Sequence, residues 1–217
     1  MTSATPQRAR SMAAKQQRER DILAAARTLA GTRPVRDITL TDVAAAVGMH
    51  KSAMLRYFET REQIFLALTA EGWRDWSAAI RAALDAAEAE PEHVAAAIAR
   101  TLVERPLFCD LLAHAPLNLE RNVSLEAVRD YKMATRREIG PMVDDLHRVL
   151  GLTEEQAIDL IATATSLAGA FWQMAAPGTA LRAFYEATPE LTHAVVDVEP
   201  RLARILSALL DGMRAGR

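Results

Sequence analysis

The chain has 217 residues, half of them hydrophobic and a quarter charged, and its 26 basic and 28 acidic side chains give a formal net charge of −2. This composition is typical of a globular protein with an ample core. A single cysteine, Cys109, excludes an internal disulfide framework and fits a reducing cytoplasm. No apolar run approaches the length of a membrane span, and the polar, basic start of the chain lacks the apolar segment of a secretion signal. We therefore expect a cytoplasmic protein without a membrane partner.

The charge is distributed unevenly along the chain. Residues 1–62 carry eleven basic against six acidic side chains, a balance of +5, whereas the rest of the chain carries the remaining 15 basic and 22 acidic side chains, a balance of −7. A basic N-terminal part on an acidic body is expected where one end of a protein contacts nucleic acid. Taken alone, an asymmetry of this size could also arise by chance.

The first 30 residues divide into two parts. Residues 1–14 lack periodic apolar side chains and predict a flexible basic arm. Arg8 and Arg10 in this arm would reach a DNA backbone or minor groove, although an idle tail explains them equally well. From residue 15 to residue 30 the apolar spacing predicts a first helix, which Gly31 ends.

Residues 39–58 predict two short helices joined by a tight turn. Thr39 and Asp42 have the spacing of a capping box, with a shorter acid than usual. A small residue inside the first helix and a glycine four positions later are typical of a helix-turn-helix, because the two helices must cross closely and the turn needs a positive φ. The residues expected to pack this unit are Val43, Ala44, Val47, Gly48, Met49, Met54 and Phe58.

The outer surface of the second helix carries two cations, a hydroxyl, an imidazole and a phenol, with no acid before Glu59. Such a face suits the major groove of DNA, where phosphates line the rim and base edges form the floor. The alternative is a solvated helix in an all-α domain without DNA. The residues expected to contact DNA are Thr39, Thr41, His50, Lys51, Ser52, Ala53, Leu55, Arg56 and Tyr57.

The stretch from about Gln17 to Leu68 resembles the N-terminal DNA-binding domain of the tetracycline-repressor (TetR) family of transcriptional regulators. Phe58 and the Arg61–Glu62 pair match the family pattern. His50 stands where the family usually has Ser or Thr, and Leu55 stands where a phosphate-contacting Tyr is usual. Arg56 and Tyr57 would take over that contact. The resemblance implies a homodimer that binds a palindromic operator and is released by a small molecule.

Beyond the helix-turn-helix the chain predicts a larger helical domain, so the fold class is all-α: a basic arm at 1–14, a three-helix DNA-binding domain at 15–60 and an effector-binding and dimerisation domain at 61–217. Thr60 with Gln63 and Thr153 with Gln156 form further capping-box patterns. The helices expected in this domain are about 61–84, 94–103, one from Pro106, 123–150 with a kink at Pro141, 154–176 and one from Pro200, with a loop at 116–122 and a short helical piece within 179–197.

No pattern points to catalysis, a metal or a cofactor. The chain has no nucleophile elbow, no phosphate-binding glycine loop and no paired-histidine zinc motif. Cys109 and His114 lie five positions apart, off a shared helical face, and Asp144, Asp145 and His147 fit a solvated face. We therefore expect a protein that is not an enzyme and that needs no cofactor.

Aromatic side chains on apolar helices suggest a cavity for an apolar effector, although each of them singly fits a plain core position. The expected pocket residues are Trp73, Trp76, Phe108, His114, Tyr131, Phe171 and Trp172. A second expectation is dimerisation through the small-residue helix at 154–176 and the broad apolar stripe of the last helix, in keeping with the four-helix interface that the resemblance implies. The expected interface residues are Ala162, Gly169, Leu202, Leu206, Leu209 and Met213.

These features favour a ligand-responsive DNA-binding regulator, with repression more in keeping with the resemblance than activation. Two alternatives stay open from the sequence: an architectural DNA-binding protein that responds to no ligand, and an enzyme built on a helical scaffold. The identity of the effector and the sequence of the operator are not encoded in any pattern of the chain.

Overall fold

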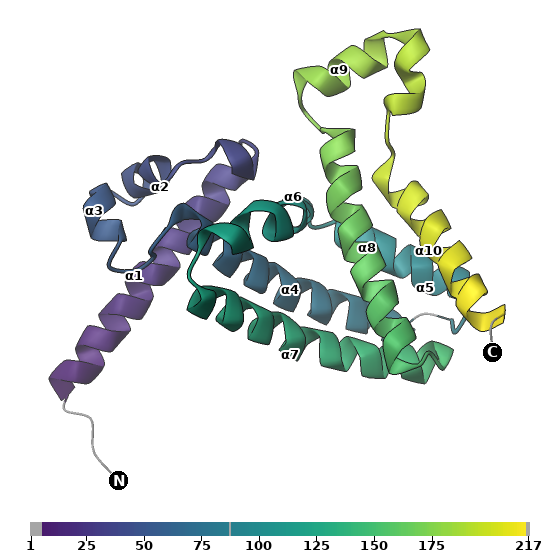
Figure 1. Cartoon of the computed structure of the whole chain (residues 1–217), viewed down its shortest axis with the longest axis horizontal. Coiled ribbons are helices and arrows are strands. Elements are labelled where there is room, and N and C mark those ends of the chain that lie inside the picture. Colours follow the sequence, from purple (N-terminus) through teal and green to yellow (C-terminus); the bar gives the residue numbers. More distant parts are fainter. Residues whose placement is uncertain (1–5, 87, 216–217) are drawn as a thin grey trace.

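The computed structural model describes residues 6–86 and 88–215, with side chains described from residue 12 onward. Every regular element in these residues is helical and no strand occurs among them, so the fold is all-α, as the sequence predicts. We call residues 6–60 the head and the described residues from 61 to 215 the body. The head lies at one end of the body, with the long first helix extending away from it (Figure 1).

The head contains α1 (Pro6–Ala30), the 3₁₀ turn η1 (Val35–Asp37), α2 (Leu40–Ala46) and α3 (Lys51–Met54). Its core is built from apolar side chains of all these elements, which are fully or almost fully buried. Together they hold α2 and α3 against the C-terminal half of α1. The core residues are Ile22, Ala26, Val35, Ile38, Val43, Ala44, Met54 and Phe58.

The sequence predicted a flexible arm over residues 1–14. This prediction is wrong for residues 6–14, because α1 begins at Pro6, and residues 1–5 lie outside the described residues. Proline is well tolerated at the first position of a helix, and the alanine, arginine and glutamine residues that follow are good helix formers. The side chains from residue 12 to residue 18 are all exposed, Met12 at 58 %, so this stretch of α1 needs no apolar face. An ion pair between Lys15 and Glu19, at 3.8 Å, lies along its surface.

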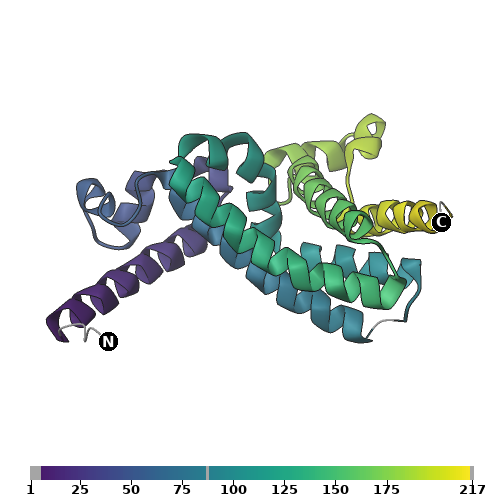
Figure 2. The same ribbon diagram turned by 60° about the horizontal axis from the view of Figure 1, so that its bottom comes forward.

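The body consists of seven helices whose pairing follows their apolar faces. α4 lies along α7, α5 packs against α10, and α6 packs against α8, which also contacts α7 and α10. Figures 1 and 2 both show α4 and α7 side by side, running from the head to the far end of the body. The bounds are α4 (Arg61–Ala86), α5 (Pro91–Val103), α6 (Pro106–His114), α7 (Leu125–Leu150), α8 (Glu154–Ala175), α9 (Ala180–Ala187) and α10 (Val198–Ala215).

Local differences from the sequence predictions have simple causes. The loop expected at 116–122 is instead a π-helical turn, Ala115–Leu119, followed by a 3₁₀ turn, Glu120–Asn122, and Leu119 within it is fully buried. The last helix begins at Val198 rather than at Pro200. A proline fits there because the first N–H groups of a helix have no partner inside it. Pro141 lies inside the continuous helix α7.

Between α8 and α10 a small lobe protrudes from the helical bundle (Figure 1, top). It consists of α9 and the 3₁₀ turn η4 (Pro189–Ala194), and neither element contains a buried residue. Leu181 and Phe184 on α9 are about half exposed, at 48 % and 55 %. The lobe therefore adds little to the core.

Candidate nucleic-acid interface and effector clefts

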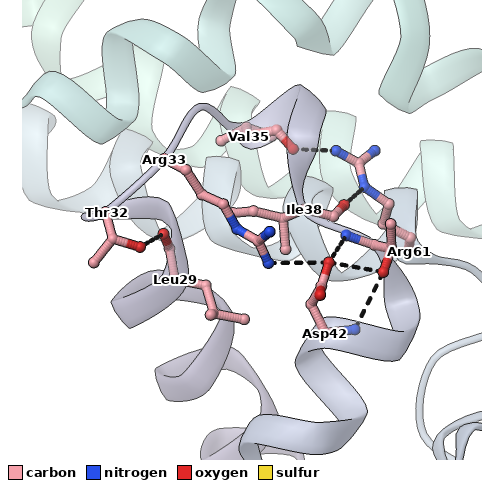
Figure 3. A network of polar contacts seen from close by, with 8 residues as sticks. Leu29, Thr32, Arg33, Val35, Ile38, Asp42 and Arg61 are labelled. Atoms are coloured by element: carbon pink, nitrogen blue, oxygen red, sulfur yellow. Dashed lines mark hydrogen bonds and ion pairs between the residues drawn. The ribbon is translucent and has the colours of Figure 1, made fainter. Parts of the chain in front are cut away.

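The start of α2 is fixed by a reciprocal cap. The N–H of Thr39 donates to Asp42 Oδ2 at 2.7 Å, and the N–H of Asp42 donates to Thr39 Oγ1 at 3.2 Å. Arg33 Nη2 lies 3.0 Å from the same carboxylate oxygen (Figure 3). The backbone N–H of Thr39, then its hydroxyl, then Arg33 lower the pKa of Asp42 to about 2. Because the Thr39 hydroxyl serves this cap, it holds α2 in place rather than standing free for a phosphate.

The turn between α2 and α3 has the geometry of a helix-turn-helix. Gly48 adopts φ +65°, a conformation that side chains disfavour, and the N–H of Met49 donates to Ala44 O at 2.9 Å. α3 itself has only four residues, and turns continue from it to Tyr57, so the second helix is shorter than expected. Of the packing residues, Val43, Ala44, Met54 and Phe58 are buried, Val47 and Met49 are half-buried, and Gly48 is exposed.

The opposite face of this unit points to solvent. Lys51 and Arg56 are exposed and form no ion pair with any other described residue. Leu55 between them is 53 % exposed. Seven of the nine residues expected at DNA are exposed, namely Thr39, Thr41, His50, Lys51, Ser52, Leu55 and Arg56, and two, Ala53 and Tyr57, are half-buried. The tip of the head therefore offers two uncompensated cations around a solvent-facing turn, a surface suited to phosphate.

The head is attached to the body by polar contacts that the sequence did not reveal. Arg61, at the start of α4, donates to the carbonyl oxygens of Val35 and Ile38 (Figure 3). Glu59 accepts from the Ser124 hydroxyl at 2.6 Å and from the Ser124 N–H at 3.1 Å, and these bonds, the hydroxyl first, lower the pKa of Glu59.

The expected second capping box at the start of α4 is only partly formed. The N–H of Gln63 donates to the Thr60 hydroxyl at 3.1 Å, but the Gln63 side chain accepts from Glu59 N instead of from Thr60 N. The side chain thereby reaches back one residue further than in a regular box. It holds Glu59 in the position from which that carboxylate meets Ser124 of α7.

The aromatic residues expected to enclose a cavity pack against one another instead. The ring centroids of Trp73 and Trp76 are 5.6 Å apart, those of Trp73 and Phe108 are 5.6 Å apart, and both pairs meet edge to face. The indole N–H of Trp73 donates to the Tyr131 hydroxyl at 3.3 Å, and that of Trp76 donates to the Thr101 hydroxyl at 3.1 Å. The edge-to-face packing fills the space between these rings, so they enclose no cavity among themselves, and of this cluster only Phe108 borders one of the two clefts between the head and the body.

The remaining three residues of the expected pocket lie apart from this cluster. Phe171 is buried beneath the guanidinium of Arg201, which lies 5.1 Å from the ring centroid. His114 Nε2 lies 3.4 Å from Asp110 Oδ1. Trp172 is half-buried and borders a cleft between the head and the body. The seven residues therefore do not form one site.

Two clefts open where the head meets the body. The larger cleft has a volume of about 470 Å³. One side of it is formed by the end of α1 and the segment that follows, and the other side by α6 and the end of α8. Arg33, Asp110 and Trp172 border it. The smaller, of about 300 Å³, lies between α1, α4 and α6, with Leu68, Phe108 and Leu111 on an apolar floor. Both clefts include Gly31, Pro106 and Leu107, so they flank the same end of α6. Small-molecule sites in proteins have comparable volumes.

The expected dimer residues fall into two groups. Leu202 and Leu206 are completely buried within the protomer, and Gly169 is buried against the backbone of α6, so these three pack the protomer's own core and the expectation is wrong for them. Ala162 is exposed, and Leu209 and Met213 are half-buried further along the same face of α10, where they pack against the edge of the core. The outer face of α8 adds Ile158, 42 % exposed, and Met174, 50 % exposed, at the helical spacing of Ala162.

Within the described residues, no group of three or more histidine, cysteine or acidic side chains is arranged to hold a metal. Cys109 is buried, its thiol donates to Leu102 O at 3.2 Å, and burial raises its pKa to about 12. Such a thiol is a poor nucleophile at neutral pH. No described helix combines the length and hydropathy that crossing a bilayer requires.

Comparison with known families matches the chain in two adjoining parts. A model described as "Bacterial regulatory proteins, tetR family" matches residues 22–68, and one described as "Tetracyclin repressor-like, C-terminal domain" matches residues 70–217. No curated protein sequence matches the chain significantly.

Solved structures share the fold at low sequence identity. A TetR transcriptional regulator from Rhodococcus sp. RHA1 is 16 % identical, with a TM-score of 0.55 over 93 % of this chain and 98 % of that one. The fatty acid degradation regulator FadR from Bacillus halodurans is 13 % identical, with a TM-score of 0.56 over 88 % and 96 %. FadR from Bacillus subtilis, solved in complex with stearoyl-CoA, is 15 % identical, with a TM-score of 0.51 over 82 % and 98 %. Since the two family models together cover both the helix-turn-helix and the helical body, the chain belongs to the tetR family of bacterial transcriptional regulators.

Proposed function

We propose that this protein is a cytoplasmic transcriptional repressor, not an enzyme, which binds a palindromic operator as a homodimer and releases it when a small apolar molecule binds. The observation that carries the proposal is the solvent-facing turn around α3, where Lys51 and Arg56 have no acidic partner among the described residues. One head offers a single reading surface. Two heads related by a two-fold axis would read two half-sites, which makes the operator a palindrome.

The exposed face of α8 and the partly exposed C-terminal end of the α10 stripe support the dimer. Ile158, Ala162 and Met174 form an exposed stripe of apolar and small side chains along α8, and Leu209 and Met213 lie half-buried on α10. Small residues let helices of two subunits approach closely, as a four-helix interface requires. The interface therefore uses the exposed row of α8 and the partly exposed C-terminal end of the α10 stripe, whose first residues, Leu202 and Leu206, are buried in the protomer's core.

The two clefts support an effector that acts at the junction of head and body. The smaller cleft has an apolar floor of Leu68, Phe108 and Leu111 and a volume of about 300 Å³, so it would accept a small apolar molecule or one end of a longer one. The effector must bind the DNA-incompetent arrangement more tightly than the DNA-competent one, because a ligand with equal affinity for both shifts nothing.

The experiment is selection of bound sequences from a random DNA library by the purified protein, followed by titration of the selected operator at several salt concentrations. We expect a two-fold symmetric sequence for the parent. The double variant K51A/R56A should bind it more weakly and lower the slope of log affinity against log salt by about 1.8 per subunit, at about 0.9 per phosphate contact.

The matched control is R100A/R129A, which removes two exposed body cations that form no ion pair with other described residues. This control should bind like the parent. Selection of no common sequence by the parent would favour a ligand-independent architectural protein. Equal salt slopes for the parent and K51A/R56A would disprove the assignment of the DNA-binding face.

A further inference from the structure

Asp110 is a buried carboxylate on α6, only 7 % exposed, in a helix that is otherwise largely apolar. Its Oδ2 accepts a hydrogen bond from the backbone N–H of Val35, at 2.9 Å, in the η1 turn of the head. Its Oδ1 accepts from Gln173 Nε2 on α8, at 2.7 Å, and lies 3.4 Å from His114 Nε2 on its own helix. One side chain thus joins two helices of the body to the backbone of the head.

The η1 turn is held from its other side as well. Arg61 donates to the carbonyl oxygens of Val35 and Ile38 (Figure 3). Together with the bond to Asp110, Val35 thus has both its N–H and its C=O bonded to charged side chains of the body. The Val35 side chain is itself fully buried. Ile38 directly precedes Thr39, the capping residue of α2. The position of η1 therefore fixes where α2 begins.

The carboxylate of Asp110 keeps its charge at neutral pH in spite of its burial. Burial by itself raises the pKa of Asp110, but the nearby His114 imidazole and the hydrogen bonds from Val35 and Gln173 together outweigh burial and hold the pKa below its ordinary value. A buried charge is tolerated only where hydrogen bonds compensate the loss of water. An apolar residue at position 110 would avoid the free-energy cost of burying a charge, but it could not accept the hydrogen bond from the Val35 N–H of the head. The presence of an acid at this position is therefore explained by its contact with the head.

We propose that Asp110 is a positioning residue for operator binding: through Val35 it sets the orientation of the head on the body and hence the separation of the two heads in a dimer. This role rests on the operator binding proposed above. The larger cleft is bordered by Asp110, Gln173 and Arg33, so a molecule in it touches both sides of the contact. Occupancy of that cleft and the orientation of the head are thereby linked.

The test compares operators whose half-sites are moved together or apart by one base pair. Asp110→Ala removes the acceptor of the Val35 N–H, so the head is no longer held in one orientation on the body. If each head then has the DNA-binding orientation for about one tenth of the time, the affinity for the operator with natural spacing falls about tenfold per half-site. We also expect Asp110→Ala to discriminate less than the parent between the operator with natural spacing and the operators whose half-sites are moved by one base pair. Asp110→Asn keeps an oxygen for the Val35 N–H and should retain the preference.

The control is Thr101→Val, which removes a buried hydroxyl bonded to Trp76 inside the body, away from the head. It should lower the melting temperature but leave the preference for spacing intact. All variants are compared well below their melting temperatures and after sedimentation has shown that they are dimers.

Equal spacing preferences for Asp110→Ala and Thr101→Val would overturn the positioning role. If Asp110→Ala does not fold, Asp110→Leu decides the matter, because an apolar side chain fills the buried position but cannot accept the hydrogen bond from the Val35 N–H. A parental preference for spacing in this variant would also overturn the proposal. Failure of the parent to bind any selected DNA would instead disprove the proposed function itself.

Discussion

Replacing Gly169 by alanine tests how closely α8 packs against α6. A Cβ atom at this position would lie 2.8 Å from Ala113 N, 3.1 Å from Ala113 Cα and 3.2 Å from Leu112 C. All three are backbone atoms of α6, so no side-chain rotation relieves the overlap and the two helices must move apart. Overpacking of this kind costs about 1–3 kcal/mol, whereas alanine recovers about 1 kcal/mol of helix propensity over glycine. We expect a net loss of up to about 2 kcal/mol.

At about 2–4 °C per kcal/mol for a chain of this size, the melting temperature of Gly169→Ala should fall by up to about 8 °C, measured by circular dichroism. Gly212→Ala is the matched control, because this helical glycine has no atom within 4 Å of an added Cβ, and it should raise the melting temperature by about 2–4 °C. Because Asp110 lies three residues before Ala113 on α6, Gly169→Ala should also weaken operator binding. A Gly169→Ala variant as stable as Gly212→Ala would refute the close packing of α6 on α8.

Further outcomes follow from single contacts. Thr39→Ala removes the cap of α2 and should cost about 1 kcal/mol in urea unfolding. Because the folded pKa of Asp42 is depressed from 3.8 to about 2, its contribution to stability is complete above about pH 4 and disappears as the pH falls towards 2, so the stability of Asp42→Asn should fall less over that range. The Cys109 thiol should resist an aromatic disulfide reagent at pH 8 until the protein is unfolded. Leu209→Asp should give folded monomers in sedimentation, whereas Leu206→Asp, which buries an unpaired charge, should prevent folding.

Features that depend on neighbours in the sequence were predictable. The capping boxes at Thr39–Asp42 and Thr153–Gln156 are both formed, and Gly48 has the positive φ that its place after α2 requires. These signals involve residues within a few positions of each other, where backbone geometry leaves few alternatives. The helix-turn-helix and the all-α class rest on them.

Features that depend on distant partners could not be predicted. Asp110 meets Val35 and Gln173, which lie 75 and 63 positions away, and it stands in the sequence as one acid in an apolar helix. The sequence showed that several aromatic side chains lie on apolar helices, but it did not show whether their rings would enclose a cavity or pack against one another. In the last helix the apolar stripe keeps to one face, but Leu206 is fully buried within the protomer whereas Leu209 is only half-buried, and periodicity alone does not show where burial ends along the stripe.

The packed aromatic cluster bears on how an effector would act. Trp73 and Trp76 of α4 interlock with Phe108 of α6, and a side chain at Gly72 would overlap the Phe108 ring, so α4 and α6 are held as one block. This block carries both anchors of the η1 turn, the guanidinium at the start of α4 and the carboxylate on α6. An effector in either cleft that displaces α6 would therefore move both anchors in the same direction. The head would turn as a unit, because the cap at the start of α2 follows the turn that these anchors hold.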